Sequence, residues 1–142
     1  MLVKVRWSWI RTADPPDPRW GWTGALYAIV APSGHRIVYI GKAGYRTIRQ
    51  RWVPSAKAPF WDWLERRGVC RHGILAGYVK LGPGRRLSTA LLSDIESLLI
   101  HWVRPPGNIQ SRGSRVTRPG LQVRCSGTWP LRQQTFSDLP EG

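Results

Sequence analysis

The sequence predicts an α+β domain built on a small antiparallel or mixed sheet of about three strands. Two apolar runs rich in Val, Ile and Tyr, 25–31 and 36–40, are separated by four turn residues and predict a β-hairpin. Residues 72–81 predict a third strand. Between Ser88 and Val103 the apolar residues recur at helical spacing and predict a helix. The 142 residues are most simply one domain.

The hairpin and the segment after it bring three chemically useful side chains together. Each strand carries one tyrosine, Tyr27 and Tyr39, and the second strand is expected to stop at Gly41. Ile48 and Arg51 share a face if a helix begins just before them. Phenols can relay a proton and a guanidinium can fork onto phosphate oxygens. The alternative is that they are ordinary half-buried strand residues and a solvated helix residue.

The helix over 88–103 is expected to pack one apolar stripe, about 120° wide, into the core. A proline pair ends it, and Asn108 follows where a turn must form. Asp94 and Glu96 lie on opposite borders of the stripe, about 160° apart, and are not expected to share one metal. A carboxylate at such a border can face a cleft while its helix stays packed. The stripe consists of Leu91, Leu92, Ile95, Leu98, Leu99 and Trp102.

The charge balance predicts a polyanionic partner. The chain has 22 Lys and Arg against 8 Asp and Glu, for a net charge of +14, and Arg outnumbers Lys by 18 to 4. Arg favours forked acceptors such as phosphodiesters, and an acidic membrane surface is the weaker alternative. Between residues 19 and 134 the carboxylates available for chemistry are Asp62, Glu65, Asp94 and Glu96.

Cysteine usage and hydropathy predict a cytoplasmic protein without a membrane segment. Two cysteines are too few for a disulfide framework, and no stretch approaches a membrane-spanning length. Cys70, His72, His101 and Cys125 are a conceivable zinc set, but their spacing matches no compact zinc finger.

The two ends of the chain are expected to flank a core at 24–108. Residues 1–23 begin with apolar residues that alternate with basic ones, which predicts an added edge strand; its Trp and Arg residues alternatively suit nucleic acid. Residues 60–67 predict a short helix. Residues 109–142 are Arg-rich and predict a loose extension with one strand near 121–123, either a polyanion-binding arm or a soluble tail.

Four short motifs occur in a fixed order along residues 24–108. The first is Ala25-Leu26-Tyr27 and the second is Tyr39-Ile40-Gly41, with eleven residues between the two tyrosines. Ile48-Arg49-Gln50-Arg51-Trp52 supplies an apolar-x-x-Arg segment. The fourth motif consists of Glu96, Ile100, Pro105 and Asn108.

These motifs resemble those of the GIY-YIG nucleases, a superfamily that includes homing endonucleases, some restriction enzymes and the incision subunit of bacterial excision repair. Ala25 stands where the family has Gly, and no His follows the arginine segment. The resemblance implies an α/β sandwich, in which helices flank a central antiparallel or mixed sheet. It also implies that the tyrosines, the arginine and the glutamate converge on that sheet.

The activity that the resemblance implies is metal-dependent hydrolysis of DNA phosphodiester bonds. Glu96 would hold one Mg²⁺ or Mn²⁺, and Arg51 would stabilise the phosphoryl charge. Tyr27 would act as the general base or orient the water, and Tyr39 would hydrogen-bond the phosphate or water. Because a free phenol is a poor base at neutral pH, the cationic surroundings, with Lys42, would have to favour a phenolate.

The remaining expectations concern substrate contacts and partners. Arg46 and Arg49 are expected to bind substrate, with Arg49 the fallback for the family arginine; Asn108 either joins them or fixes the loop after the helix. DNA, duplex or single-stranded, is expected in preference to RNA, and the oligomeric state is left open. The alternatives are a non-catalytic DNA- or RNA-binding module on the same scaffold and a basic protein of a ribonucleoprotein particle.

Overall fold

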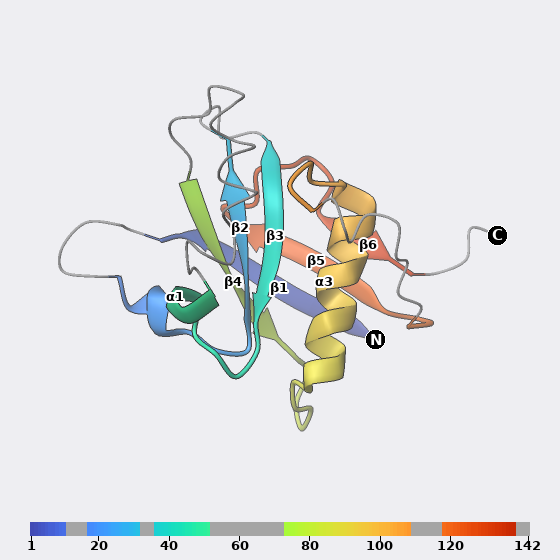
Figure 1. Ribbon diagram of the computed structural model, residues 1–142. Helices are drawn as coiled ribbons and strands as arrows, with labels where there is room; N and C mark the ends of the chain where they lie inside the picture. Colours follow the sequence, from blue (N-terminus) through green and yellow to red (C-terminus); the bar gives the residue numbers. More distant parts are fainter. Residues whose placement is uncertain (11–16, 32–35, 52–72, 109–117, 139–142) are drawn as a thin grey trace.

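The computed structural model describes residues 1–10, 17–31, 36–51, 73–108 and 118–138, and these form one mixed sheet with helices beside it (Figure 1). The strands are β1 (Leu2–Trp9), β2 (Ala25–Val30), β3 (Ile37–Ala43), β4 (Gly73–Lys80), β5 (Gln122–Gly127) and β6 (Thr135–Ser137). The helical elements are the 3₁₀ turn η1 (Pro18–Gly21) and the helices α1 (Ile48–Arg51) and α3 (Thr89–Val103).

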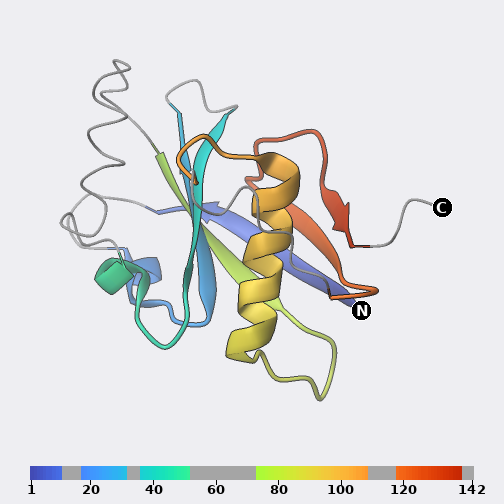
Figure 2. The same cartoon turned by 45° about the vertical axis from the view of Figure 1, so that its right-hand side comes forward.

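The predicted α/β sandwich with a three-stranded sheet is wrong. Strands β3, β2 and β4 pair antiparallel, but the sheet continues through β1, β5 and β6 in the order β3-β2-β4-β1-β5-β6. It curls into a half-barrel, with α3 along its concave side (Figures 1 and 2). Among the described residues only α1 and α3 are α-helices, so helices do not enclose this sheet. The chain ends were expected to be extensions, yet they supply half of its strands.

Strand β1 lies in the interior of the sheet and is not an edge strand. It pairs antiparallel with β4 and parallel with β5 along almost its whole length. The predicted alternation itself is confirmed, because Val3, Val5 and Trp7 are buried while Lys4 and Arg6 are exposed. An interior position satisfies the backbone groups of both edges of β1, which an edge strand would leave open.

The hairpin and the third strand are confirmed, with one change of boundary. Strand β3 does not stop at Gly41 but runs to Ala43, which pairs with Ala25. The turn at 32–35 and the predicted helix at 60–67 lie outside the described residues. Strand β4 pairs with both β1 and β2, so it connects the hairpin to the strands from the chain ends.

Helix α3 forms where its pattern predicts. The Ser88 hydroxyl accepts a hydrogen bond from the Leu91 N–H at 3.0 Å, and Arg104 ends the helix in the left-handed region at φ 51°. Five of the six residues of the predicted stripe are buried. The sixth, Trp102, is 40% exposed, and its indole N–H donates to the Ser137 carbonyl at 3.2 Å; its predicted burial is wrong.

The two faces of the sheet differ in what covers them. The inner face packs against α3 in a large apolar core that includes Leu26, Ile40 and Leu99. The outer face carries a smaller cluster in which Tyr27 and Tyr39 pack with η1 and α1. Within the described part of the chain, no helix has the length and apolar character needed to cross a membrane.

Candidate active site

The two hairpin tyrosines stack side by side on the outer face. The ring centroids of Tyr27 and Tyr39 lie 6.0 Å apart with an interplanar angle of 28°. Tyr27 pairs across the strands with Gly41, and a Cβ added to Gly41 would lie 2.5 Å from the Tyr27 hydroxyl oxygen. The glycine of the second motif is therefore required by the tyrosine of the first, whose ring crosses over β3.

Burial sets the protonation of this pair. It is the largest cause that raises the pKa of Tyr27, which has no exposed surface, and of Tyr39, which is partly exposed. The hydrogen bond between the two side chains raises the pKa of Tyr27 and lowers that of Tyr39. The expected phenolate at Tyr27 is not favoured in this structure, because burial outweighs the lowering effect of Arg51.

Arg51 reaches the tyrosines from α1, whose start is fixed by a capping box. The Thr47 N–H donates to Gln50 Oε1 at 2.8 Å, and the Gln50 N–H donates to Thr47 Oγ1 at 3.1 Å. Ile48 is fully buried and anchors this turn to the outer face. The positive charge of Arg51 lowers the pKa of both tyrosines, so its guanidinium lies within electrostatic range of them.

Glu96 acts electrostatically on the same tyrosines from α3. Its charge raises the pKa of both phenols, and its side chain is partly exposed. Lys42 Nζ donates to Ser93 Oγ at 2.5 Å and so ties β3 to α3 one turn before Glu96. Asp94 instead forms an ion pair with Arg118. The two carboxylates of α3 therefore diverge, as their spacing predicts.

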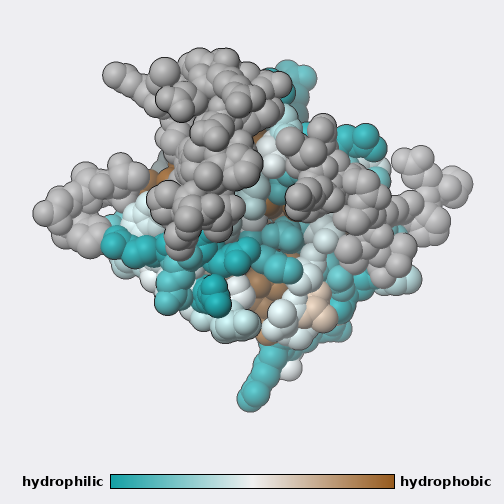
Figure 3. Space-filling model, in the orientation of Figure 1, coloured by the Kyte–Doolittle hydropathy of each residue, from teal (hydrophilic) through white to brown (hydrophobic). Residues whose placement is uncertain are grey.

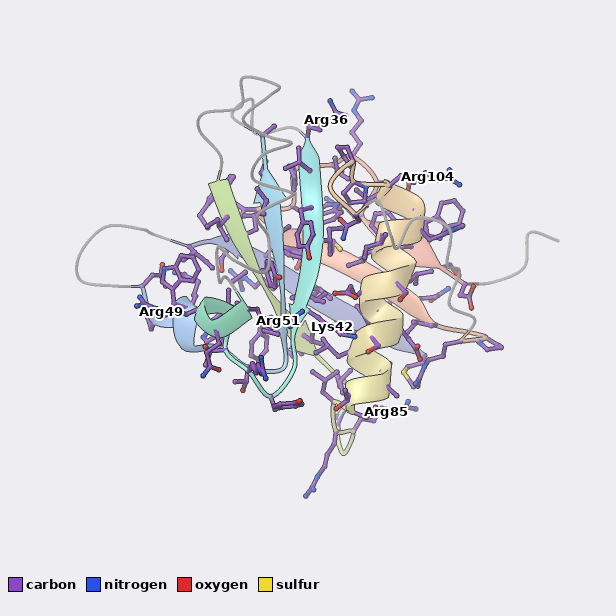
Figure 4. The ribbon with its side chains drawn as sticks, in the orientation of Figure 1. Arg36, Lys42, Arg49, Arg51, Arg85 and Arg104 are labelled. Carbon is purple, nitrogen blue, oxygen red and sulfur yellow. The ribbon has the colours of Figure 1, made fainter. Side chains whose placement is uncertain are left out.

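The charges of Arg51, from α1, and of Glu96, from α3, thus both act on the stacked pair of Tyr27, from β2, and Tyr39, from β3. Figure 4 shows Arg51 and Lys42 between α1 and α3. The surface around α1 is mainly hydrophilic in the space-filling view (Figure 3).

Asn108 has a structural position. Its Oδ1 accepts from the Ile40 N–H at 2.9 Å and its Nδ2 donates to the Ile40 carbonyl at 2.8 Å, with 7% of the residue exposed. The amide thereby satisfies the outer edge of β3, and the Gly107 N–H continues the pattern to the Val38 carbonyl at 2.8 Å. This geometry favours the loop-fixing role over substrate contact. Arg46, just before α1, and Arg49, within it, are both exposed.

The expected metal site suits an ion whose remaining ligands are water and substrate oxygens. Among the described residues, no group of three or more His, Cys, Asp or Glu side chains is arranged to hold a metal. Glu96 offers one carboxylate, and Mg²⁺ retains several waters and accepts phosphate oxygens. The residues present therefore fit a magnesium ion shared with a phosphate.

The zinc alternative receives no support. Cys125 lies in the inner-face core with no exposed surface, and His101 packs edge-on against Trp102 in the last turn of α3. Cys70 and His72 lie outside the described residues.

Two supporting residues were missed in the sequence. Ser93 holds Lys42, and Gln50 completes the cap of α1. The Thr47-x-x-Gln50 spacing is a recognisable capping box and was a usable signal. Nothing in the sequence indicated a role for Ser93, because its partner Lys42 lies on a strand that is distant in sequence.

Comparison with known proteins does not assign a family. A scan against protein-family models and searches of curated proteins and of solved structures found no match to this chain. The resemblance to the GIY-YIG nucleases therefore remains a prediction, and the site is described by its own geometry.

Proposed function

We propose that this chain is a metal-dependent endonuclease of the GIY-YIG type that hydrolyses phosphodiester bonds of DNA. The observation that supports it is that the charges of Arg51 and Glu96, from α1 and α3, both act on the stacked Tyr27–Tyr39 pair. Packing alone needs no carboxylate beside two phenols in a chain with a net charge of +14. Phosphodiester hydrolysis needs charge stabilisation, a metal ligand and a positioned water.

Each side chain has a distinct role in this proposal. Arg51 binds the non-bridging oxygens and stabilises the charge that develops on the phosphate. Glu96 holds the divalent ion, which when bound polarises the phosphate and stabilises the leaving oxygen. Tyr39, the more exposed phenol, hydrogen-bonds the phosphate or the attacking water.

The buried partners position these groups. Tyr27 is fully buried and shares a hydrogen bond with Tyr39, so it orients the second phenol. Lys42 holds α3 against β3 through Ser93 and thereby fixes the approach of Glu96 to the pair. Both residues act through another side chain, which replaces the role of general base first expected for Tyr27.

The test is cleavage by the purified full chain. Supercoiled plasmid and single-stranded circular DNA are incubated with Mg²⁺, Mn²⁺ or EDTA, beside Glu96→Gln, whose unfolding temperature is measured in parallel. We expect metal-dependent nicking or cutting by the wild type and loss of at least 10²-fold in rate in the variant, on the order of the loss from removing a main electrostatic group.

Absence of cutting has a defined meaning. Tight, salt-sensitive DNA binding with no metal-dependent cleavage of either substrate would overturn the nuclease and support the non-catalytic binding module. Equal cleavage by the wild type and a folded Glu96→Gln variant would overturn the assignment of the site.

A further inference from the structure

The outer face of the sheet continues beyond the tyrosine pair and becomes strongly basic on β4, β1 and β5. Val3, Val5 and Trp7 of β1 face the inner core, so Lys4 and Arg6 project from the opposite face, where both are exposed. The same alternation puts exposed residues of β4 and β5 on this face: Tyr78, Lys80 and Arg124. We call Lys4, Arg6, Tyr78, Lys80 and Arg124 the basic face.

The strand register aligns three cations in one row. Lys4 lies directly opposite Lys80 on one side and Arg124 on the other. With strands about 4.8 Å apart, the row is about 10 Å long. Like charges directly opposite one another destabilise a sheet. None of the described acidic residues lies on β1, β4 or β5; these residues are Asp17, Asp94, Glu96 and Asp138. The row therefore has no carboxylate on its own strands to neutralise it.

An exposed aromatic ring stands within this basic face. Tyr78 lies directly opposite Arg6 and two residues from Lys80, and it is 56% exposed. Trp22 packs its ring against Tyr78 edge-on, with centroids 5.8 Å apart and an interplanar angle of 68°. This contact holds the phenol in place and leaves much of it open to solvent. Cations that surround an exposed, supported ring are the combination that binds phosphates and stacks bases.

We propose that the basic face binds single-stranded DNA, with phosphates on Lys4, Lys80 and Arg124 and a base stacked on Tyr78. A base inside a duplex has both faces covered by its neighbours, so stacking on Tyr78 requires an unpaired base. The choice of DNA rests on the proposed nuclease, whereas the binding itself does not depend on cutting.

The basic face leads directly to the candidate active site. Tyr78 is two residues from Ala76, and Ala76 pairs with Tyr27 on β2. The Cα atoms of Tyr78 and Tyr27 are thus diagonal neighbours, about 8 Å apart on the same face. A strand held on the basic face therefore reaches the tyrosine pair within a few nucleotides, so the basic face would present single-stranded DNA to the cutting site.

Binding is tested with the full chain in EDTA, which separates it from cleavage. Fluorescence anisotropy reports the affinity for a labelled thymidine oligonucleotide of about 12 nucleotides and for a duplex of equal length, over a series of salt concentrations. The variants are Lys4→Gln with Lys80→Gln, and Tyr78→Thr, which keeps a residue suited to a strand. The matched control is Arg85→Gln with Arg86→Gln, which removes the same charge from an exposed turn.

We expect the two variants to weaken DNA binding in different ways. The lysine pair should reduce the slope of log K against log salt by about 1.4, because two single-strand phosphate contacts are lost. Tyr78→Thr should weaken single-strand binding by about 5- to 150-fold and leave duplex binding unchanged. The control should change the slope by less than half as much as the lysine pair. The lysine variant should unfold at the same or a higher temperature, since it removes a like-charge pair.

Several results would overturn the proposal. These are unchanged single-strand affinity in a folded Tyr78→Thr variant, an equal loss of slope in the control, or tighter binding to the duplex or to an RNA of the same sequence. If binding behaves as expected but the wild type cuts no DNA in the presence of a divalent metal, the binding proposal is supported and the proposed nuclease activity is refuted. If the wild type cuts DNA but the variants show none of these binding effects, the nuclease proposal is supported and single-strand binding by the basic face is refuted.

Discussion

The two faces of the sheet are built on different principles. The inner face is explained by burial, because its apolar residues close a single core with α3. The outer face has a small apolar cluster around Tyr27, and beyond it the basic face. Its cations serve no packing purpose in the described residues, and Tyr78 stays exposed although Trp22 packs against it. The comparison teaches that apolar packing and exposed positive charge are segregated on opposite faces of the same strands.

This segregation predicts its largest effect on stability from the inner face. Leu99→Ala removes a fully buried side chain from the middle of α3 and should cost about 3–5 kcal/mol of unfolding free energy through lost transfer energy and a cavity. Chemical denaturation measures the cost. The cleavage rate per folded molecule should stay within about twofold of the wild type, on the order expected for a residue without contact to substrate; a much larger loss would break the separation of the faces.

Arg51→Gln should have the opposite effect to Leu99→Ala: a large loss of cleavage rate with little loss of stability. It removes the cation that acts on both tyrosines and should lower the single-turnover cleavage rate by about 10²–10³, equivalent to ~3–4 kcal/mol. Because Arg51 is exposed, the unfolding free energy should change little. Arg49→Gln, on the same turn of helix, is the matched control. Equal rate losses in both variants would mean that α1 contributes only general positive charge.

Asn108→Ala tests the edge of β3, where the two faces meet. It leaves the Ile40 N–H and carbonyl without their side-chain partners and should cost about 1–3 kcal/mol of unfolding free energy. A DNA Kd measured in EDTA should be unchanged if the residue is structural. Weakened DNA binding with unchanged stability would indicate that Asn108 contacts the substrate.

The last effect concerns pH and lies in the inner core. Burial raises the pKa of Cys125 from its ordinary value of 9.0 to about 12. The neutral thiol is favoured in the fold, so its contribution is complete below pH 9 and is lost as pH rises from 9 towards 12, by up to about 1.4 kcal/mol per pH unit. Cys125→Val should remove this part of the alkaline loss in denaturation curves at pH 8, 9.5 and 10.5. Curves that stay parallel to the wild type would contradict it.

Local patterns predicted the hairpin, the third strand and α3 correctly, because each is encoded by its own period and stop signals. The same patterns did not reveal the sheet. Residues 2–9 read as a strand, but nothing local indicates that β1 lies between β4 and β5, which are distant in sequence. Trp102 fits the apolar stripe of α3, yet it is partly exposed and bonds to Ser137, since tertiary contacts overrode the helical period.

For the candidate site, the sequence predicted which residues to consider but not their protonation. Tyr27, Tyr39, Arg51 and Glu96 were selected from motif spacing, and the structure brings their charges and rings together. The protonation of Tyr27 was not predictable, because it depends on complete burial beneath neighbouring elements. The alternation at the start of the chain predicted one basic face for β1. The row of Lys4, Lys80 and Arg124 escaped prediction, since it exists only through strand register.

The two carboxylates of α3 provide the most direct test of the central claim. Glu96 acts on the tyrosine pair, whereas Asp94, two residues away on the same helix, is paired with Arg118. The measurement is the initial rate of plasmid nicking in Mg²⁺ by Glu96→Gln and by Asp94→Asn, each confirmed to be folded. We predict that Asp94→Asn stays within about twofold of the wild type and that Glu96→Gln is at least 10²-fold slower, on the scale of a principal electrostatic group. Wild-type rates in both variants, or an equal loss in both, would contradict the account.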